Sequence, residues 1–166
     1  MELTRETPLS SIHRKYGAKM VHFAGWEMPL FYKTITYEHE AVRTKAGIFD
    51  LTHMGELRIS GKNCGLELAQ LTTNDPTKLS LGRIQYSLLC HPKGGIIDDI
   101  LVYRLKDEFL LVVNAANTVK DYEWIKSHLK GSAKVEDLTN SIALIAIQGP
   151  ESEKIVRELE PIADCY

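Results

Sequence analysis

The sequence predicts a protein of the α+β class, because three strands follow one another directly and helical segments flank them. The apolar runs at 86–90, 96–104 and 109–114 are rich in β-branched and aromatic residues, as strands are. The turns between these runs are too short for the crossover that parallel strands require, so the three strands should form an antiparallel meander. A helix with the apolar residues Val119, Tyr122, Ile125 and Leu129 on one face is expected at 118–129, after the meander. Helices beside consecutive antiparallel strands are typical of α+β proteins.

Two helices and a loop are expected in the first part of the chain. The first predicted helix spans residues 7–16, with Thr7 as N-cap. The second begins at Thr34 or Thr36, either of which could be its N-cap, and runs to Arg43; a glycine follows each helix. Residues 18–33 are rich in aromatic residues and broken by glycine and proline, and we interpret them as an irregular loop.

The remaining elements complete a discontinuous domain organisation. Strands are expected at 56–60, 135–138 and 142–148, a short helix follows Gly61, and a helix at 151–159 has acidic residues in its first turn. We expect residues 1–54 and 141–166 to form one incomplete domain. Residues 55–140 would be an inserted antiparallel α+β domain.

Composition favours an ordinary globular protein. Of the 166 residues, 44% are hydrophobic and 25% are charged, which is enough apolar material for a core. The net charge of −2 argues against a nucleic-acid surface or a basic membrane patch. The three cysteines are far apart and odd in number, which favours a reducing compartment over a disulfide framework. With no signal peptide or membrane span in the sequence, a soluble cytoplasmic protein is expected.

Two adjacent aspartates, Asp98 and Asp99, interrupt the apolar run at 96–103. Because side chains alternate along a strand, Asp99 should share one face with Ile97, and Asp98 should share the other with Ile96. A buried carboxylate without partners is costly, so we expect at least one of the pair to have a specific role. That role is either a structural bond to a loop amide or lysine, or the orientation of a cation or amine at a pocket wall.

Other polar groups on the predicted sheet are less specific. For Tyr86 and Tyr103, ordinary packing is the simpler interpretation by residue type, although a flat apolar ligand with polar edges would use them too. Asn114 lies at the end of the third strand of the meander. The six histidines have no helical i, i+4 spacing, so no metal site is expected.

Several long strings, taken together, resemble the aminomethyltransferase (T protein) family of the glycine cleavage system. The resemblance runs from about Thr7 to the end of the chain. The strings, in their order along the chain, are GAKMVHFAGWEMPL at 17–30, AGIFDLTHMG at 46–55, TND at 73–75, GGIIDD at 94–99, VNAAN at 113–117 and AIQGP at 146–150.

This resemblance implies a folate-binding fold, of which the chain holds a truncated part, and a role in glycine catabolism and one-carbon metabolism. The family moves an aminomethyl carbon from the lipoyl arm of the H protein to tetrahydrofolate and releases ammonia. Tetrahydrofolate is the acceptor, no metal takes part, and the lipoylated H protein is the partner rather than a nucleic acid or a membrane. Asp99 matches the family's essential acid, and the residues matched to the folate cavity are Met54, Tyr86, Tyr103 and, near it, Asn114.

Two alternatives lie in related families. One is a folate-binding module of the same superfamily that serves iron–sulfur assembly without transfer, and the other is a folate domain fused to a flavin oxidase. The aspartate pair and the WEMP string at 26–29 favour the transferase. Family members are more than twice as long as this chain, and residues 161–166 do not resemble the end of a domain. We therefore expect an inactive fragment that binds folate weakly by itself.

Overall fold

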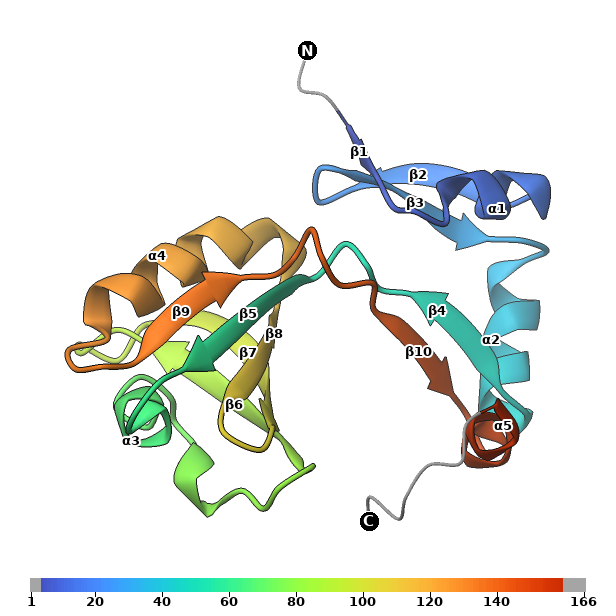
Figure 1. Cartoon of the computed structure of the whole chain (residues 1–166). Helices are drawn as coiled ribbons and strands as arrows, with labels where there is room; N and C mark the ends of the chain where they lie inside the picture. The colour runs from blue at the N-terminus through green and yellow to red at the C-terminus, as the bar shows by residue number, and fades with distance from the viewer. Residues whose placement is uncertain (1–3, 160–166) are drawn as a thin grey trace. The chain divides into compact units, whose positions relative to one another are not determined.

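The computed structural model describes residues 4–159, and the α+β class is confirmed (Figure 1). The predictions for residues 160–166, including the end of the first domain and Cys165, lie outside the described residues. Contacts divide the described chain into two compact units. The first unit comprises residues 4–53 and 143–159, and the second comprises residues 54–142.

Two small sheets and three helices make up the first unit. One sheet has the strand order β1-β3-β2, with β1 parallel to β3, and β4 pairs with β10 in an antiparallel ribbon. The elements are β1 (Arg5–Glu6), α1 (Ser10–Lys15), β2 (Lys19–Phe23), β3 (Trp26–Phe31), α2 (Ile35–Thr44), β4 (Gly47–Asp50), β10 (Ile145–Gln148) and α5 (Ser152–Leu159).

The prediction of an irregular loop at 18–33 is wrong, because this segment forms the hairpin of β2 and β3. Its two-residue turn, Ala24-Gly25, has φ of 49° and 84°, the left-handed values that a tight hairpin turn needs. Alanine is an unusual residue for such a turn, so the sequence lacks the usual hairpin signal. Pro29 also suggested a break, but β1 pairs only beside Trp26 and Glu27, which leaves the proline with no strand on that side.

The two threonine caps have different outcomes. Thr34 does cap α2, since its hydroxyl accepts a hydrogen bond from the Tyr37 amide at 3.2 Å. Thr7 does not cap α1 directly, because the helix begins only at Ser10. The Thr7 hydroxyl instead accepts from the Leu9 amide and donates to Asp50. Its partner in the fold therefore lies 43 residues away, beyond what a capping pattern can reveal.

The second unit contains the predicted antiparallel meander, extended beyond β8 by two further strands to give the order β6-β7-β8-β5-β9. Its elements are β5 (Gly55–Ser60), α3 (Cys64–Leu68), β6 (Ile84–Cys90), β7 (Ile96–Arg104), β8 (Phe109–Val113), α4 (Thr118–His128) and β9 (Lys134–Asp137), with single 3-10 turns at Pro76–Lys78 and Ala115–Asn117.

One face of this sheet forms the core with α3 and α4. The buried side chains of this face include Leu57, Leu89, Val102 and Leu111. Helix α4 adds Ile125, which is fully buried. We predicted that Val119 would share this helix face, but Val119 is 75% exposed. The inner position belongs instead to Asp121, which has no exposed surface.

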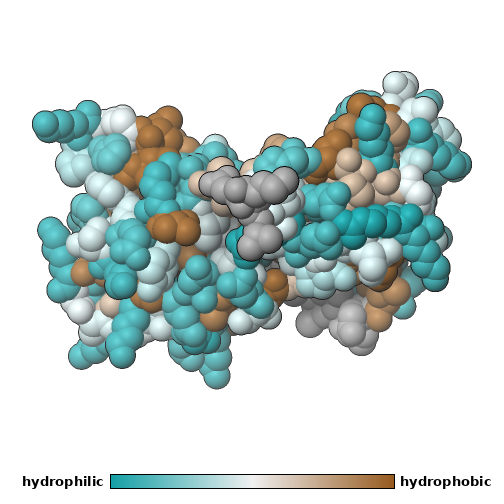
Figure 2. Space-filling model, turned by 90° about the horizontal axis from the view of Figure 1, so that it is seen from above, coloured by the Kyte–Doolittle hydropathy of each residue, from teal (hydrophilic) through white to brown (hydrophobic). Residues whose placement is uncertain are grey.

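Large apolar side chains reach the surface in both units, and Figure 2 shows hydrophobic patches among the hydrophilic residues. In the first unit, Ile48 on β4 and Ile145 on β10 are 71% and 47% exposed. No helix in residues 4–159 combines the length and the apolar character needed to cross a membrane.

Gly55 offers a test of the packing between β5 and α4. A Cβ at this position would lie 2.4 Å from the Thr118 hydroxyl and 2.7 Å from a Val113 methyl group. We expect Gly55→Ala to lower the free energy of unfolding by roughly 1–3 kcal/mol, because the core must shift to admit the methyl group. Gly95→Ala is the control, since its nearest atom is an ordinary 3.6 Å away. Equal urea midpoints for the two variants would contradict this packing.

Candidate functional site

Strand register brings the five sequence-predicted residues to one face of the five-stranded sheet. Opposed residues of antiparallel strands point to the same side, and Leu88 opposes Asp99 while Tyr86 opposes Leu101. Continuing the β7–β8 and β5–β8 registers by one pair places Asn114 beside Asp99 and Met54 beside Asn114. The row Met54-Asn114-Asp99 thus crosses three strands at one end of the sheet. Tyr86 and Tyr103 follow on the same face, farther along β6 and β7.

The two aspartates face opposite sides of β7. Asp98 is 5% exposed and points toward the core, whereas the Asp99 side chain is exposed. The predicted neighbours are wrong, however. Cys90 pairs with Ile96 and Leu89 pairs with Asp98, so Ile97 is the extra residue of a β-bulge. The bulge breaks the alternation, and Ile97 is buried in the core while Ile96 is exposed.

Asn114 connects the two carboxylates. Its Nδ2 lies 3.0 Å from Asp98 Oδ1, 3.0 Å from Asp99 Oδ1 and 3.2 Å from the Asp99 carbonyl oxygen, and donates toward all three. Its backbone N–H donates to Asp98 Oδ2 at 3.2 Å. Ionised carboxylates can only accept hydrogen bonds, so Asn114 must turn its NH2 group rather than its oxygen toward Asp98 and Asp99. Asp99 is therefore exposed but held in place.

The two tyrosines differ in their surroundings. The Tyr86 side chain is 56% exposed and lies near the Asp99 carboxylate. Partial desolvation raises the pKa of Tyr86, and the negative charge of Asp99 raises it further. Tyr103 is half-buried, and burial alone raises its pKa. Both hydroxyls therefore stay protonated near neutral pH and can donate hydrogen bonds on this face.

Asp98 is the centre of a buried polar cluster that the sequence did not reveal. Asn117 Nδ2 donates to Asp98 Oδ1 at 2.6 Å, and the Asp121 carboxyl on α4 interacts with the same carboxylate. Burial works to raise the pKa of Asp98, but these interactions outweigh it and hold the pKa below its usual value. For Asp121, burial together with the neighbouring charged carboxylate of Asp98 raises the pKa to about 8.

Glu56 lies on the same face of the sheet as Asp99 and was not among the predicted site residues. It opposes Val112 on β8, is 1% exposed, and its carboxylate oxygens have no hydrogen-bond partner in the described chain. Burial raises its pKa to about 7, and the charge of Asp137 acts in the same direction. The alternation of residues 56–60 suggested a solvent-facing glutamate, so the sequence held no signal for its burial.

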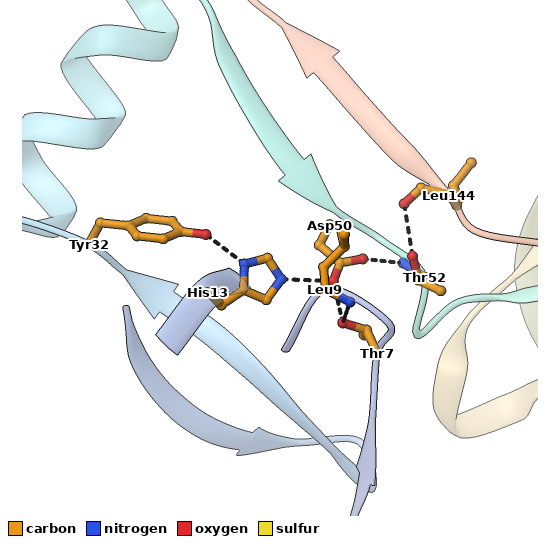
Figure 3. A network of polar contacts seen from close by, with 7 residues as sticks. All are labelled: Thr7, Leu9, His13, Tyr32, Asp50, Thr52 and Leu144. Atoms are coloured by element: carbon orange, nitrogen blue, oxygen red, sulfur yellow. Dashed lines mark hydrogen bonds and ion pairs between the residues drawn. The ribbon is translucent and has the colours of Figure 1, made fainter. Parts of the chain in front are cut away.

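A separate polar network lies within the first unit (Figure 3). His13 sits between Tyr32 and Asp50, with Nδ1 2.7 Å from the Tyr32 hydroxyl and Nε2 2.9 Å from Asp50 Oδ2. Asp50 also accepts from the Thr7 hydroxyl at 2.6 Å and from the Thr52 amide at 3.0 Å. Burial opposes ionisation of Asp50, but the bonds from His13, Thr7 and Thr52 prevail and lower its pKa.

The network borders a cavity of about 600 Å³ with mostly apolar walls, which include Leu9, Tyr16 and Ile145. No cysteine, serine or lysine lines this cavity as a nucleophile. Asp50 already accepts three hydrogen bonds, and His13 is engaged at both ring nitrogens. We therefore interpret the network as a structural tie between α1, β3 and β4. In residues 4–159, no three histidine, cysteine or acidic side chains gather in a way that could hold a metal ion.

Unlike the His13–Asp50 network, the sheet face that carries Asp99 has the features of a chemical site. It presents a fixed and accessible carboxylate, two tyrosine hydroxyls and apolar side chains on a rigid sheet. A carboxylate held in this way can stabilise positive charge that develops on a bound amine, without reorganising during the reaction.

Comparison with protein families and known proteins gives a consistent result. The family model described as the GCVT N-terminal domain matches residues 9–165. Curated aminomethyltransferases of Anoxybacillus flavithermus and Bacillus subtilis are 45% identical over 161 residues and 44% identical over 158 residues. These matches cover 96% and 95% of this chain but 44% of each relative. The chain thus spans less than half the length of these curated relatives.

A solved structure resembles the fold as well. The glycine cleavage system aminomethyltransferase T from Bartonella henselae superimposes with a TM-score of 0.88 at 33% sequence identity. The match covers 93% of this chain and 43% of that structure.

The raised pKa of Asp121 predicts the pH dependence of stability. A carboxyl that is protonated in the folded state and ionised when unfolded loses its stabilising effect as pH rises from about 4 to the folded pKa of about 8. We expect the free energy of unfolding to fall by roughly 1–3 kcal/mol between pH 6 and 8, and then to level off. Asp121→Asn should flatten this slope in urea titrations at several pH values. An equally steep slope in the variant would count against a neutral Asp121.

Asp50 allows a matching test in the first unit. Asp50→Asn replaces an acceptor by a donor opposite the His13 and Thr7 protons, so we expect a loss of roughly 1–3 kcal/mol in stability. Hydrogen exchange of the first-unit amides would measure this loss. Glu40→Gln, at an exposed position on α2, is the control. If both variants leave amide protection unchanged, Asp50 does not tie these elements together.

Proposed function

Because the chain belongs to the GCVT N-terminal domain family, we propose that it is part of a tetrahydrofolate-dependent aminomethyltransferase of the glycine cleavage system. The observation that carries this proposal is the exposed Asp99 carboxylate, held on the sheet by a hydrogen bond from Asn114. The names of the curated relatives support transfer over a folate-binding module without transfer. The proposal concerns the whole protein, of which this chain is one part.

In the proposed reaction, a lipoylated H protein delivers the aminomethyl group. Nitrogens N5 and N10 of tetrahydrofolate each form a bond to the electron-poor methylene carbon, while its bonds to the amine nitrogen and to the lipoyl sulfur break. The two N–H protons of the folate pass to these leaving groups, which depart as ammonia and the lipoyl thiol, and the carbon remains on the folate. Positive charge develops on the nearby amines during this exchange. Asp99 is the group proposed to stabilise that charge. Holding donor and acceptor together in one cavity would also remove a large entropic barrier.

The other site residues are proposed to bind the folate. Tyr86, Tyr103 and Met54 share the sheet face with Asp99 and offer flat or apolar contact area, and the two hydroxyls can meet the polar edges of a pterin. Asn114 lies between Met54 and Asp99 and orients the carboxylate. No metal is assigned a part in this chemistry.

The two compact units are proposed to correspond to the discontinuous first domain and the domain inserted into it. The free Cys64 and Cys90 fit a reducing compartment, and we place the enzyme in the cytoplasm. Residues 4–159 hold only one wall of the proposed folate site, so the chain by itself should bind tetrahydrofolate weakly.

The experiment uses a chimera in which this chain replaces the matching part of the Bacillus subtilis aminomethyltransferase. With aminomethylated H protein and tetrahydrofolate, the chimera should form methylenetetrahydrofolate and ammonia. Asp99→Asn keeps the shape of the side chain and removes the charge, so kcat should fall on the order of a hundredfold or more. The KM for tetrahydrofolate should change much less, since an amide can still form hydrogen bonds.

Asp107→Asn, at an exposed position between β7 and β8, is the control for the loss of one charge. Asp98→Asn should chiefly lower stability and reduce kcat less than Asp99→Asn, because Asp98 faces the core. If the chimera folds and Asp99→Asn keeps full kcat, the proposed role of Asp99 is wrong. A folded chimera that binds folate and transfers nothing would instead favour the binding module.

A further inference from the structure

The Asp98 carboxylate can accept more hydrogen bonds than the three that N–H groups of the described chain donate to it. Its Oδ1 accepts from the side-chain amides of Asn114 and Asn117, and its Oδ2 accepts from the Asn114 backbone N–H. A carboxylate offers about four lone-pair positions, so one on Oδ2 is left over. The side chain that interacts with Asp98 from α4 is Asp121, itself a carboxylic acid.

Asp121 is fully buried, and neither of its oxygens receives a hydrogen bond from a donor in the described chain. Two facing carboxylates cannot bond to one another unless one of them carries a proton. Asp98 already accepts from three N–H groups, which stabilise its ionised form, whereas no donor stabilises ionised Asp121. The proton therefore belongs on Asp121, and its O–H donates to Asp98.

We propose that neutral Asp121 is a positioning residue for Asp99, acting through Asp98 and the Asn114 amide. The chain of contacts runs from the Asp121 O–H to the Asp98 carboxylate, then to Asn114 Nδ2, and from Asn114 to Asp99 Oδ1. Helix α4 thereby fixes, from the core side of the sheet, a carboxylate on its outer side. This inference rests on the proposed function in so far as Asp99 is the group that meets the substrate.

The charged groups around Asp121 determine how this chain of contacts from Asp121 to Asp99 responds to pH. Asp98 and Asp99 on β7 disfavour its ionisation, and Lys120 on its own helix favours it. The Lys120 ammonium is directed elsewhere, since it donates to the Ile97 carbonyl at 2.7 Å in the bulge of β7. When Asp121 loses its proton, two adjacent buried charges repel each other, and the simplest relief is for Asp98 to turn away and release Asn114.

The test observes Asn114 directly in the 166-residue chain. In ¹H–¹⁵N spectra, the side-chain amide pair of Asn114, assigned by its absence in Asn114→Ser, should shift with a midpoint near pH 8. Asp121→Asn keeps a donor toward Asp98 but cannot ionise, so the pair should stay at its low-pH position up to pH 9. Asp121→Ala removes the donor, and the pair should be displaced at every pH. Asp107→Asn should titrate like the unaltered chain.

The proposal would be overturned if the side-chain amide signal of Asn114 shifted with pH in Asp121→Asn as it does in the unaltered chain. If Asp121→Ala does not fold, the comparison of Asp121→Asn with the unaltered chain still decides the question. This experiment needs neither folate nor H protein, so its failure leaves the proposed transfer untouched. In the chimera, Asp121→Ala should lower kcat roughly ten- to a hundredfold with little change in KM, and Asp121→Asn should restore kcat. Loss of activity in every version would instead count against the transfer itself.

Discussion

The buried carboxylate of Asp98 is the constraint on which the arrangement of the second unit depends. An ionised group inside the core is tolerated only if its oxygens are hydrogen-bonded, and this requirement fixes the groups around it. The turn after β8 must bring Asn114 and Asn117 to one oxygen, and α4 must begin where Asp121 can approach. The charge of Asp98 thus joins the end of the meander, the following 3-10 turn and the first part of α4.

After the β-bulge at Ile97, the side chains of β7 alternate between the core and the outer face of the sheet. The bulge at Ile97 places both Ile97 and Asp98 in the core, and regular alternation then sends Asp99, Leu101 and Tyr103 to the outer face. Without the extra residue, Ile97 and Asp99 would point the same way. The same outer face carries Glu56, whose raised pKa of about 7 follows from burial without a partner. Groups that titrate near neutrality therefore lie on both faces of one sheet.

The first unit is organised differently, with small sheets and little buried apolar surface. Its buried hydrophobic side chains are Trp26 and Met28, while large apolar side chains such as Ile48 and Tyr16 are exposed. Polar ties supply part of what a larger core would otherwise contribute. The His13–Asp50 pair, with Thr7 and Thr52, connects segments that are distant in sequence (Figure 3).

The sequence by itself determined the class, the meander and the family resemblance, because these depend on local patterns. Runs of β-branched residues with short turns predicted β6 to β8, and a threonine cap with a later glycine predicted α2. It also singled out Asp98 and Asp99, since adjacent charges in an apolar strand are conspicuous. The hairpin at 19–31 was missed because Ala24 accepts a left-handed conformation that its residue type does not announce.

Only the tertiary structure decided which side chains contact one another and which are buried. That Asp121 rather than Val119 faces the core follows from the approach of α4 to Asp98, which no helical periodicity encodes. The bulge at Ile97 arises from the pairing of two strands, so alternation within one strand predicted the wrong neighbour for Asp99. Likewise, the burial of Glu56 and the bond between Thr7 and Asp50 depend on groups far along the chain. Local sequence fixes which conformations are available, but burial and hydrogen-bond satisfaction are properties of the assembled fold.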